Sequence, residues 1–179
     1  IASHGYSKSH PDLREMGRAA VREEVVSAKK ILEDIVSHKI AGYRAPAFSM
    51  DEEVLTVVRD AGFEYDSSLV PSRQIPGFYG NPDAPKVPFN ATEWYGVDDI
   101  TEFPITVAPF IGLPISGAWM RLLGRAYALW GLSKAMDAYS VATTYVHPWE
   151  LVDVPQFNDI PRRVPWRTGA YVRETFERL

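Results

Sequence analysis

The stretch Ser3-His4-Gly5-Tyr6-Ser7-Lys8-Ser9-His10-Pro11-Asp12-Leu13 contains two of the four histidines in this 179-residue chain. It follows a short apolar lead-in, Ile1-Ala2, which predicts the end of a β-strand. The loop after that strand brings the imidazoles of His4 and His10 close together, and neutral imidazole binds Zn²⁺, Fe²⁺ and Co²⁺. The H-x5-H spacing is not that of a helical zinc site, so the ligands would come from a loop. The alternative is a solvated loop with two unrelated histidines.

Composition excludes several classes of function. The net charge is −4, from 23 acidic and 19 basic residues, and no basic block is present, which argues against nucleic-acid binding. No apolar run is long enough to cross a bilayer. The chain has no cysteine, so a metal would be held by histidines and carboxylates. Cytoplasmic and cell-envelope locations both stay open, as does the oligomeric state. The start at Ile1, without Met, leads us to expect a fragment or a processed form.

Helices and strands alternate along the predicted chain. Apolar periodicity predicts helices over 12–37, 49–62, 116–137 and 168–179, the third apolar on most sides and hence well buried. Ser49 and Glu52 predict a capping box at the start of the second helix. Strands are expected at 1–2, 39–43, 63–65 and within 94–104, with the clearest at 141–146. The proline-rich segment 71–90 is expected to be a long loop that forms a cleft wall.

This alternation predicts a mainly parallel α/β sheet or barrel. His4, Arg44, Asp66 and His147 each come directly after a predicted strand. In parallel barrels the C-terminal strand ends meet at one face, where active sites are built. We therefore expect these residues to share one site.

His147 and Arg44 each have a functional and a structural interpretation. His147 is a candidate general acid or base that Glu150 or Asp153 could orient, or else a structural histidine before a proline. Arg44 precedes Ala45-Pro46 in a rigid loop, where its guanidinium could pair with a buried carboxylate, or else lie on the surface.

Four motifs, in the same order, resemble those of the polysaccharide deacetylases, the family with the NodB-homology fold also called carbohydrate esterase family 4. The first is Ser3-His4-Gly5-Tyr6-Ser7 followed by Ser9-His10-Pro11-Asp12-Leu13, which resembles the family's His-box. The others are Tyr43-Arg44-Ala45-Pro46-Ala47-Phe48-Ser49, then Tyr65-Asp66-Ser67-Ser68, and finally Tyr145-Val146-His147-Pro148-Trp149-Glu150. The segment Gly117–Leu123 is similar to the subgroup found near exopolysaccharide biosynthesis genes.

The resemblance implies a distorted (β/α) TIM-like barrel that lacks its first strands, in a single catalytic domain over residues 1–179 that is incomplete at its N-terminus. It implies a metal-dependent hydrolase that removes N-acetyl or O-acetyl groups from a polysaccharide or glycan. The metal would be one divalent ion, with Zn²⁺ as the first choice and Co²⁺, Fe²⁺ or Ni²⁺ as alternatives. The family's two aspartates, the base and a metal ligand, lie upstream of the His-box and are absent from this chain.

Residue roles follow by position in the matched motifs. His4 and His10 would bind the metal, His147 would be the general acid, and Arg44 would hold the catalytic-base carboxylate. The backbone N–H of Ala47 would help to bind the oxyanion. Tyr6 in the first motif and Trp149 in the last are our candidate substrate-binding residues.

The His-box spacing differs from the family's usual H-x3-H, because Lys8 occupies the position of the second histidine. We interpret Lys8-Ser9 as a small insertion that loops out, which keeps His10 as the ligand. Two other functions stay open. One is a small-molecule cyclic amidohydrolase on the same fold, and the other is a carbohydrate-binding relative that has lost catalysis.

Overall fold

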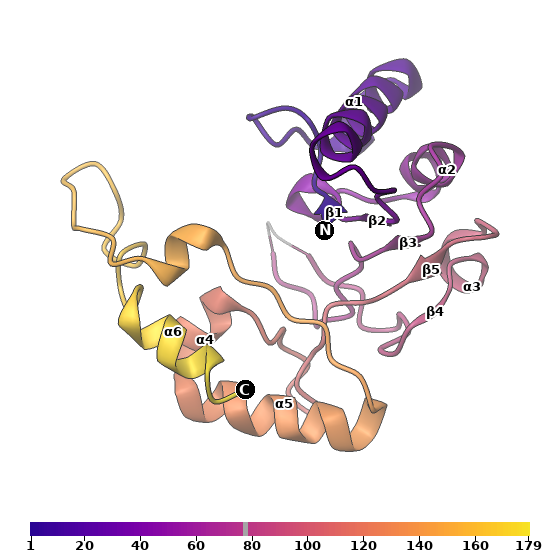
Figure 1. Cartoon of the computed structure of the whole chain (residues 1–179). Coiled ribbons are helices and arrows are strands. Elements are labelled where there is room, and N and C mark those ends of the chain that lie inside the picture. Colours follow the sequence, from indigo (N-terminus) through magenta and orange to yellow (C-terminus); the bar gives the residue numbers. More distant parts are fainter. Residues whose placement is uncertain (77–78) are drawn as a thin grey trace.

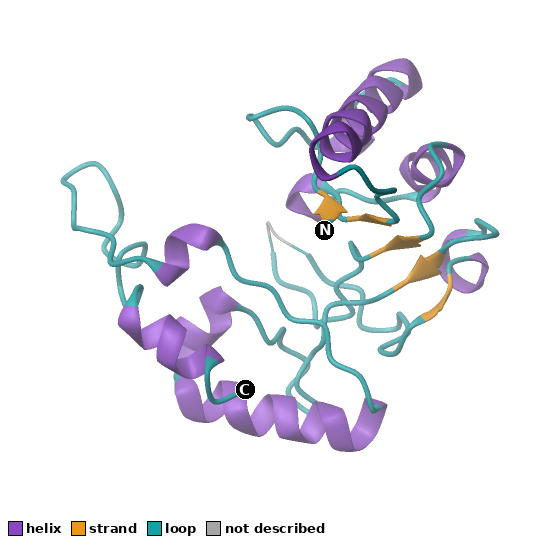
Figure 2. Cartoon of the chain, in the orientation of Figure 1, coloured by secondary structure: helices purple, strands orange, loops and turns teal. Residues whose placement is uncertain are grey.

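The computed structural model describes residues 1–76 and 79–179. It contains a mixed α/β fold (Figures 1 and 2). The described strands form one sheet in the order β1-β2-β3-β5-β4, with bounds β1 Ala2–Ser3, β2 Gly42–Tyr43, β3 Tyr65–Asp66, β5 Thr101–Glu102 and β4 Phe89–Asn90. The first four are parallel, and β4 pairs antiparallel with β5. The predicted parallel α/β architecture is confirmed, while closure into a barrel stays a prediction.

Strand register aligns the C-terminal ends of the four parallel strands, where the site residues lie. Ser3 is opposite Tyr43, Tyr43 is opposite Asp66, and Asp66 is opposite Glu102. The next residues in the chain therefore leave the sheet from the same edge, as parallel strands require.

Two helices pack on the sheet and enclose the first core. They are α1 (Arg18–Val36) and α2 (Glu52–Asp60), which follow short 3₁₀ turns at Leu13–Glu15 and Pro46–Phe48. Their apolar faces bury residues such as Val25 and Leu55 against Tyr43 of β2, and this core also holds Leu13. The helix predicted at 12–37 begins later than expected because Met16 and Gly17 have extended backbone.

The C-terminal half has a separate core, to which α4 (Gly117–Leu123) and α5 (Arg125–Tyr139) contribute, and α6 (Ala170–Phe176) contacts α4. The prediction of a single buried helix over 116–137 was wrong. Gly124 (φ +92°, ψ 167°) separates α4 from α5, because its backbone is far from helical. The exposed fractions of Leu122, Trp130 and Met136 are 59%, 40% and 45%.

The clearest predicted strand, 141–146, forms no regular strand. It makes two backbone bonds with residues 106–117, in which Thr106 N donates to Thr143 O and Gly117 N donates to Tyr145 O. Only one isolated parallel bridge, between Ser116 and Tyr145, is recorded there among the described residues. The prediction of a strand was therefore wrong, because this segment pairs with residues 106 and 116–117 and not with the sheet.

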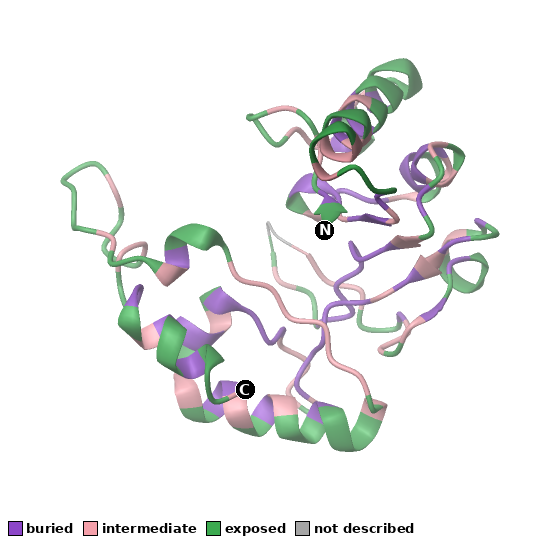
Figure 3. Cartoon of the chain, in the orientation of Figure 1, coloured by how far each residue is buried: buried purple, intermediate pink, exposed green. Residues whose placement is uncertain are grey.

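The proline-rich segment 71–90 is a long loop that enters β4, and α3 (Thr92–Tyr95) follows it. Residues 77–78 of that predicted loop lie outside the described residues. Burial is concentrated in the strands and in the central connections between the two halves (Figure 3). In the part of the chain that the structure describes, every helix is too short or too polar to cross a membrane.

Candidate active site

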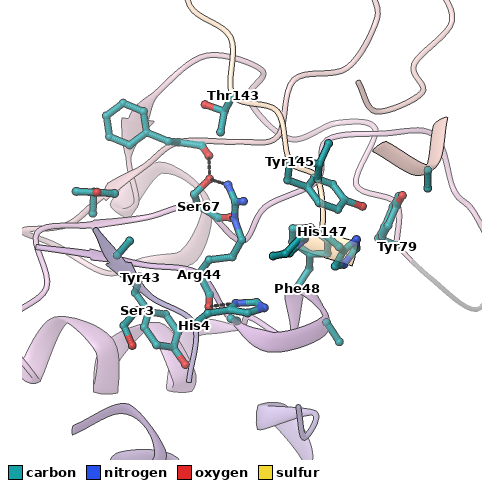
Figure 4. Close-up of a pocket in the computed structure, with 18 residues that line it drawn as sticks. Ser3, His4, Tyr43, Arg44, Phe48, Ser67, Tyr79, Thr143, Tyr145 and His147 are labelled. Carbon is teal, nitrogen blue, oxygen red and sulfur yellow. Dashed lines mark hydrogen bonds between the residues drawn. The ribbon is translucent and has the colours of Figure 1, made fainter. Parts of the chain in front are cut away.

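A cavity of about 970 Å³ lies at the edge of the sheet where the parallel strands end (Figure 4). It is lined by residues 2–4, 43–45, 47–48 and 145–148, together with Tyr65, Ser67, Tyr79, Phe103, Ala118 and Thr143. Four predicted site residues, His4, Arg44, Ala47 and His147, therefore share one cavity. Tyr79 carries the proline-rich loop to this cavity, which agrees with its predicted role as a cleft wall.

His4 leaves β1 with its ring fixed against the next loop. Its Nδ1 lies 2.8 Å from the carbonyl oxygen of Arg44. A carbonyl only accepts, so Nδ1 carries the proton and Nε2 keeps its lone pair. Desolvation lowers the pKa of His4, and the charges of His10, Arg44 and His147 add to this effect against the opposing hydrogen bond to Arg44.

His10 lies beside His4, as the sequence predicted. The two ring centroids are 5.4 Å apart and the rings are tilted by 47°. His10 has a left-handed backbone (φ +48°) and donates its N–H to Ser7 O at 3.3 Å. It is exposed and is not among the residues that line the cavity. The two imidazoles thus meet at the cavity rim.

Glu24 holds the loop between the two histidines, and sequence reasoning missed it. Its side chain is buried (4% exposed) and accepts from Tyr6 N and Ser7 N at 2.6 Å each and from Ser7 Oγ at 2.7 Å. Burial raises the pKa of Glu24, but these hydrogen bonds outweigh it and the net shift is downward. The signal was in the sequence, because Glu24 falls on the apolar face of α1 with Val21 and Val25.

Gly5 allows Glu24 to reach this loop. Its φ is +87°, and a Cβ there would lie 3.0 Å from both Glu24 Oε1 and Pro46 Cγ. A side chain at position 5 would therefore strain the backbone and crowd the carboxylate.

The guanidinium of Arg44 is anchored to the loop after β3. Its Nε donates to Ser67 O and its Nη2 donates to Ser67 Oγ, both at 2.7 Å, and Ser67 Oγ donates in turn to Phe103 O (Figure 4). Burial lowers the pKa of Arg44, and the charges of Asp66 and Glu102 oppose that shift. The predicted partner of Arg44 was a buried carboxylate. Among the described residues, the guanidinium of Arg44 instead donates its hydrogen bonds to Ser67.

Behind Ser67, two fully buried carboxyls face each other at the ends of β3 and β5. Asp66 accepts from Ser68 N and Ser68 Oγ at 2.9 and 2.8 Å, and Glu102 Oε1 accepts from Leu69 N at 2.9 Å. Glu102 Oε2 has no donor among the described residues. Burial raises the pKa of both groups, most strongly that of Glu102, where the Asp66 charge adds to the effect. We therefore expect a proton on Glu102, shared with Asp66, to satisfy the orphaned oxygen.

The loop after Pro46 has a strained backbone beside the cavity. Ala47 and Phe48 are both non-glycine residues with left-handed φ values, +51° and +57°. Such strain persists only where surrounding contacts enforce it. Here the Phe48 ring packs edge-on against Tyr145 and Tyr79, with centroid distances of 5.0 and 5.8 Å. The result is an aromatic wall opposite His4.

His147 is oriented by Glu150, one of the two carboxylates that the sequence offered for this role. Glu150 is fully buried, and its Oε2 accepts from His147 N at 2.9 Å and lies 3.2 Å from His147 Nδ1. Burial raises the pKa of Glu150, but its bonds to His147 and the charge of Arg121 lower it overall. Asp153, the other option, is exposed and lies 3.7 Å from Arg173.

Tyr6 and Trp149 lie outside the cavity lining, and their substrate-binding roles stay predictions. The Trp149 ring is stacked near His147, with centroids 5.8 Å apart at 23°, and Arg121 Cζ lies 4.9 Å from its centroid. Tyr6 is 56% exposed, beside the backbone N–H that bonds Glu24.

His4 and His10 suit a divalent metal as two of its ligands. The Nδ1 bond from His4 to a backbone carbonyl is the usual orientation of a metal-binding imidazole. A catalytic zinc site uses about three protein ligands. Within residues 1–76 and 79–179, no group of three or more His, Asp or Glu is arranged to hold an ion. Two imidazoles fall short of such a donor set, so a further ligand would have to join them to hold a catalytic ion.

Comparison with known proteins gives two family matches that divide the chain. Residues 1–65 match the family model Polysaccharide deacetylase, and residues 67–179 match the model Domain of unknown function (DUF3473). A search of curated proteins gives no match.

Solved structures show the same fold. A protein from Mycobacterium smegmatis assigned to the polysaccharide deacetylases matches with a TM-score of 0.60 at 24% identity, over 99% of this chain and 55% of its own. The allantoinase PuuE matches with a TM-score of 0.52 at 17% identity, over 82% of this chain and 44% of its own. A protein from Pseudomonas aeruginosa PAO1, also assigned to the polysaccharide deacetylases, gives 0.50 at 18% identity, over 82% and 44%. The chain thus spans about half the length of the structures it matches.

Proposed function

Because residues 67–179 belong to the DUF3473 family and residues 1–65 match the polysaccharide deacetylase model, we propose that this chain forms part of a metal-dependent hydrolase that removes N-acetyl groups, or O-acetyl groups, from a polysaccharide or glycan. One observation carries the proposal. His4, Arg44 and His147 come from separate parts of the sequence and line the same cavity. A water-binding centre on one side and a proton donor on the other are what amide hydrolysis requires.

His4 and His10 would hold the divalent ion, with Zn²⁺ as the first choice. When bound, such an ion polarises the acetyl carbonyl and lowers the pKa of a water molecule. The hydrogen bond from His4 Nδ1 to Arg44 O keeps Nε2 as the nitrogen available for this role. Glu24 keeps the connecting loop in place.

His147 would protonate the leaving amine. Its Nδ1 is directed to Glu150, so Nε2 is the nitrogen available to the cavity that His147 lines. The strained Ala47 would present its backbone N–H to the oxygen that becomes negatively charged during attack. The aromatic wall of Phe48, Tyr79 and Tyr145 would limit access of water to this region.

A general base must also deprotonate the attacking water. None of the described residues that line the cavity is an aspartate or glutamate. We infer that the base, together with a carboxylate ligand for the metal, is supplied by residues beyond the 179 of this chain. Arg44 would hold that base, since burial and its bonds to Ser67 fix the guanidinium at the cavity.

The test is acetate release by the full-length protein from N-acetylated and O-acetylated oligosaccharides, with and without Zn²⁺. His147→Ala is expected to abolish release while stoichiometric metal stays bound. Normal turnover in His147→Ala would remove this residue from the mechanism.

Two other outcomes of the same assay identify the rival functions. Hydrolysis of a cyclic ureide, with no release from glycans, would indicate a small-molecule amidohydrolase. Glycan binding without turnover at any metal concentration would indicate a binding protein.

A further inference from the structure

The carboxylate of Glu150 links His147 to the interior of the C-terminal half. Oε2 contacts His147 N and Nδ1, and Oε1 accepts from Arg121 Nε at 2.9 Å. The helix α4 makes room for this carboxylate at Gly117, where a Cβ would lie 2.2 Å from Glu150 Oε2. Gly117 and Arg121 are four residues apart and therefore lie on the same face of α4.

Arg121 is itself held by the chain that follows the proposed acid. The residue is 7% exposed, and Nη1 donates to the carbonyl oxygens of Arg163, Val164 and Trp166 at 3.2, 2.8 and 3.0 Å. Arg167 Nη1 donates back to Arg121 O at 3.1 Å. These bonds fix residues 163–167 against α4, and they leave the guanidinium little freedom to rotate.

We propose that Arg121 is a positioning residue for His147. By fixing Glu150, it keeps the imidazole in the tautomer and orientation that direct Nε2 to the cavity. The segment 163–167 is then part of the catalytic apparatus, because it determines where the guanidinium lies. This inference rests on the proposed role of His147 as general acid, and it gives residues 67–179 a role in the chemistry.

Arg125 provides a matched control in the same region. It also bonds α6, with Nε donating to Thr175 Oγ1 at 3.2 Å and Nη2 donating to Glu174 Oε2 at 2.9 Å. Its recorded contacts do not include Glu150. Both arginines join the α4–α5 region to residues after 160, so a purely structural effect of losing such bonds should appear in both variants.

The experiment compares Arg121→Gln, Arg121→Lys and Arg125→Gln in the full-length protein on two substrates. One is an N-acetylated oligosaccharide, whose leaving amine must be protonated. The other is 4-nitrophenyl acetate, whose leaving group departs without a proton. In Arg121→Gln we expect kcat for the amide to fall about 10- to 100-fold with KM unchanged, and kcat for the ester to change less than about threefold. Arg121→Lys keeps the charge and should recover part of the loss, and Arg125→Gln should retain wild-type kcat.

Equal losses on both substrates, or the same loss in Arg125→Gln, would overturn the proposal. Failure of the wild-type protein to deacetylate would refute the proposed function, and a second measurement then still tests the positioning role of Arg121. In ¹⁵N-histidine NMR spectra of wild-type protein at alkaline pH, neutral His147 should show one tautomer, with the proton on Nδ1. The general acid is the imidazolium form, which carries a second proton on Nε2 and gives that proton to the leaving amine. Arg121→Gln should mix the two tautomers. An unchanged His147 spectrum in that variant would also overturn the positioning role.

Discussion

Glu24 is a buried carboxylate whose charge is offset by two amides and a hydroxyl of the loop between β1 and α1. Among the described residues, Tyr6 N, Ser7 N and Ser7 Oγ all donate to this one carboxylate. Glu24→Ala should therefore lower the free energy of unfolding by about 1–3 kcal/mol, because two backbone N–H groups and a hydroxyl lose the buried acceptor that fixes the loop. The measurement is urea denaturation followed by circular dichroism.

Glu23→Ala is the control for this substitution, since Glu23 is exposed on the same helix. It should change stability by no more than about 0.5 kcal/mol. Equal effects of the two substitutions would show that helix propensity, and not the bonds to the loop, determines the result.

Glu102 predicts an unusual dependence of stability on pH. Burial and the charge of Asp66 raise the pKa of Glu102 well above its ordinary value of 4.5. Between these two values the folded chain retains a proton that the unfolded chain has released. By linkage, the free energy of unfolding should therefore fall as pH increases from about 4.5 toward the folded pKa.

Glu102→Gln tests this sign, because the amide can donate to Asp66 without titrating. The variant should lose most of the decrease over that range and be more stable than wild type at the upper end. Denaturation curves at a series of pH values give the slopes. Glu53→Gln, an exposed change on α2, should leave the wild-type slope intact. A Glu102→Gln slope equal to that of wild type would contradict the shared proton.

The start of α2 shows why local patterns misplace a cap. Ser49 and Glu52 fit a capping box, but the N-cap is Asp51, whose side chain accepts from Val54 N at 2.9 Å. Ser49 is buried, and its hydroxyl accepts from Leu13 N and donates to Pro46 O. Contacts distant in sequence therefore decide which of two acceptable caps the helix uses.

Asp51→Ala should accordingly cost about 1 kcal/mol of stability, within the usual 0.5–2 kcal/mol for a lost cap. Glu52→Ala should cost less than about 0.5 kcal/mol, since its side chain is exposed and caps nothing. Chemical denaturation of both variants distinguishes Asp51 as the N-cap from a capping box formed by Ser49 and Glu52. A larger loss for Glu52→Ala than for Asp51→Ala would restore the capping box.

Among the elements, helices and strands were predicted about equally well, since four predicted strands overlap β1, β2, β3 and β5 and three predicted helices overlap α1, α2 and α6. The apolar faces of α1 and α2 have a periodicity that is visible in sequence, because each packs one side on the sheet. Segment 141–146 has strand composition, but its partners are 106 and 116–117 and not the sheet. Gly124 divides α4 from α5 through one backbone conformation, which apolar periodicity does not reveal.

The motifs predicted several of the residues that line the cavity, but the contacts that hold these residues in place were harder to predict from the sequence. His4, Arg44 and His147 line the cavity as expected from their places after predicted strands, and Ala47 lines it as the resemblance implied. Asp66, which was expected to share the site, is fully buried and is not among the residues that line the cavity. Glu24 was detectable as an acid on an apolar helix face. Arg121 and Glu102 depend on pairings between distant segments, and no local pattern specifies those pairings.

Considered as a whole, the 179-residue chain should bind metal weakly. Two imidazoles without a carboxylate provide fewer ligands than a catalytic zinc site needs. By isothermal titration calorimetry, we expect a Zn²⁺ dissociation constant at least about 100-fold larger for this chain than for the full-length protein. His4→Ala should remove the residual binding. Tight stoichiometric binding by this chain would show that no outside ligand is needed.

The cavity lies between two separately packed cores, with His4 and Arg44 attached to one and His147 to the other. The sequences of the two cores can therefore diverge at different rates, since a substitution inside one core does not have to be compensated inside the other. Selection should be most coupled where the two halves meet beside the cavity, at the contact of the Phe48 ring with the Tyr145 ring. In a family descended from a common ancestor, paired changes should accumulate along that contact, while each core drifts independently.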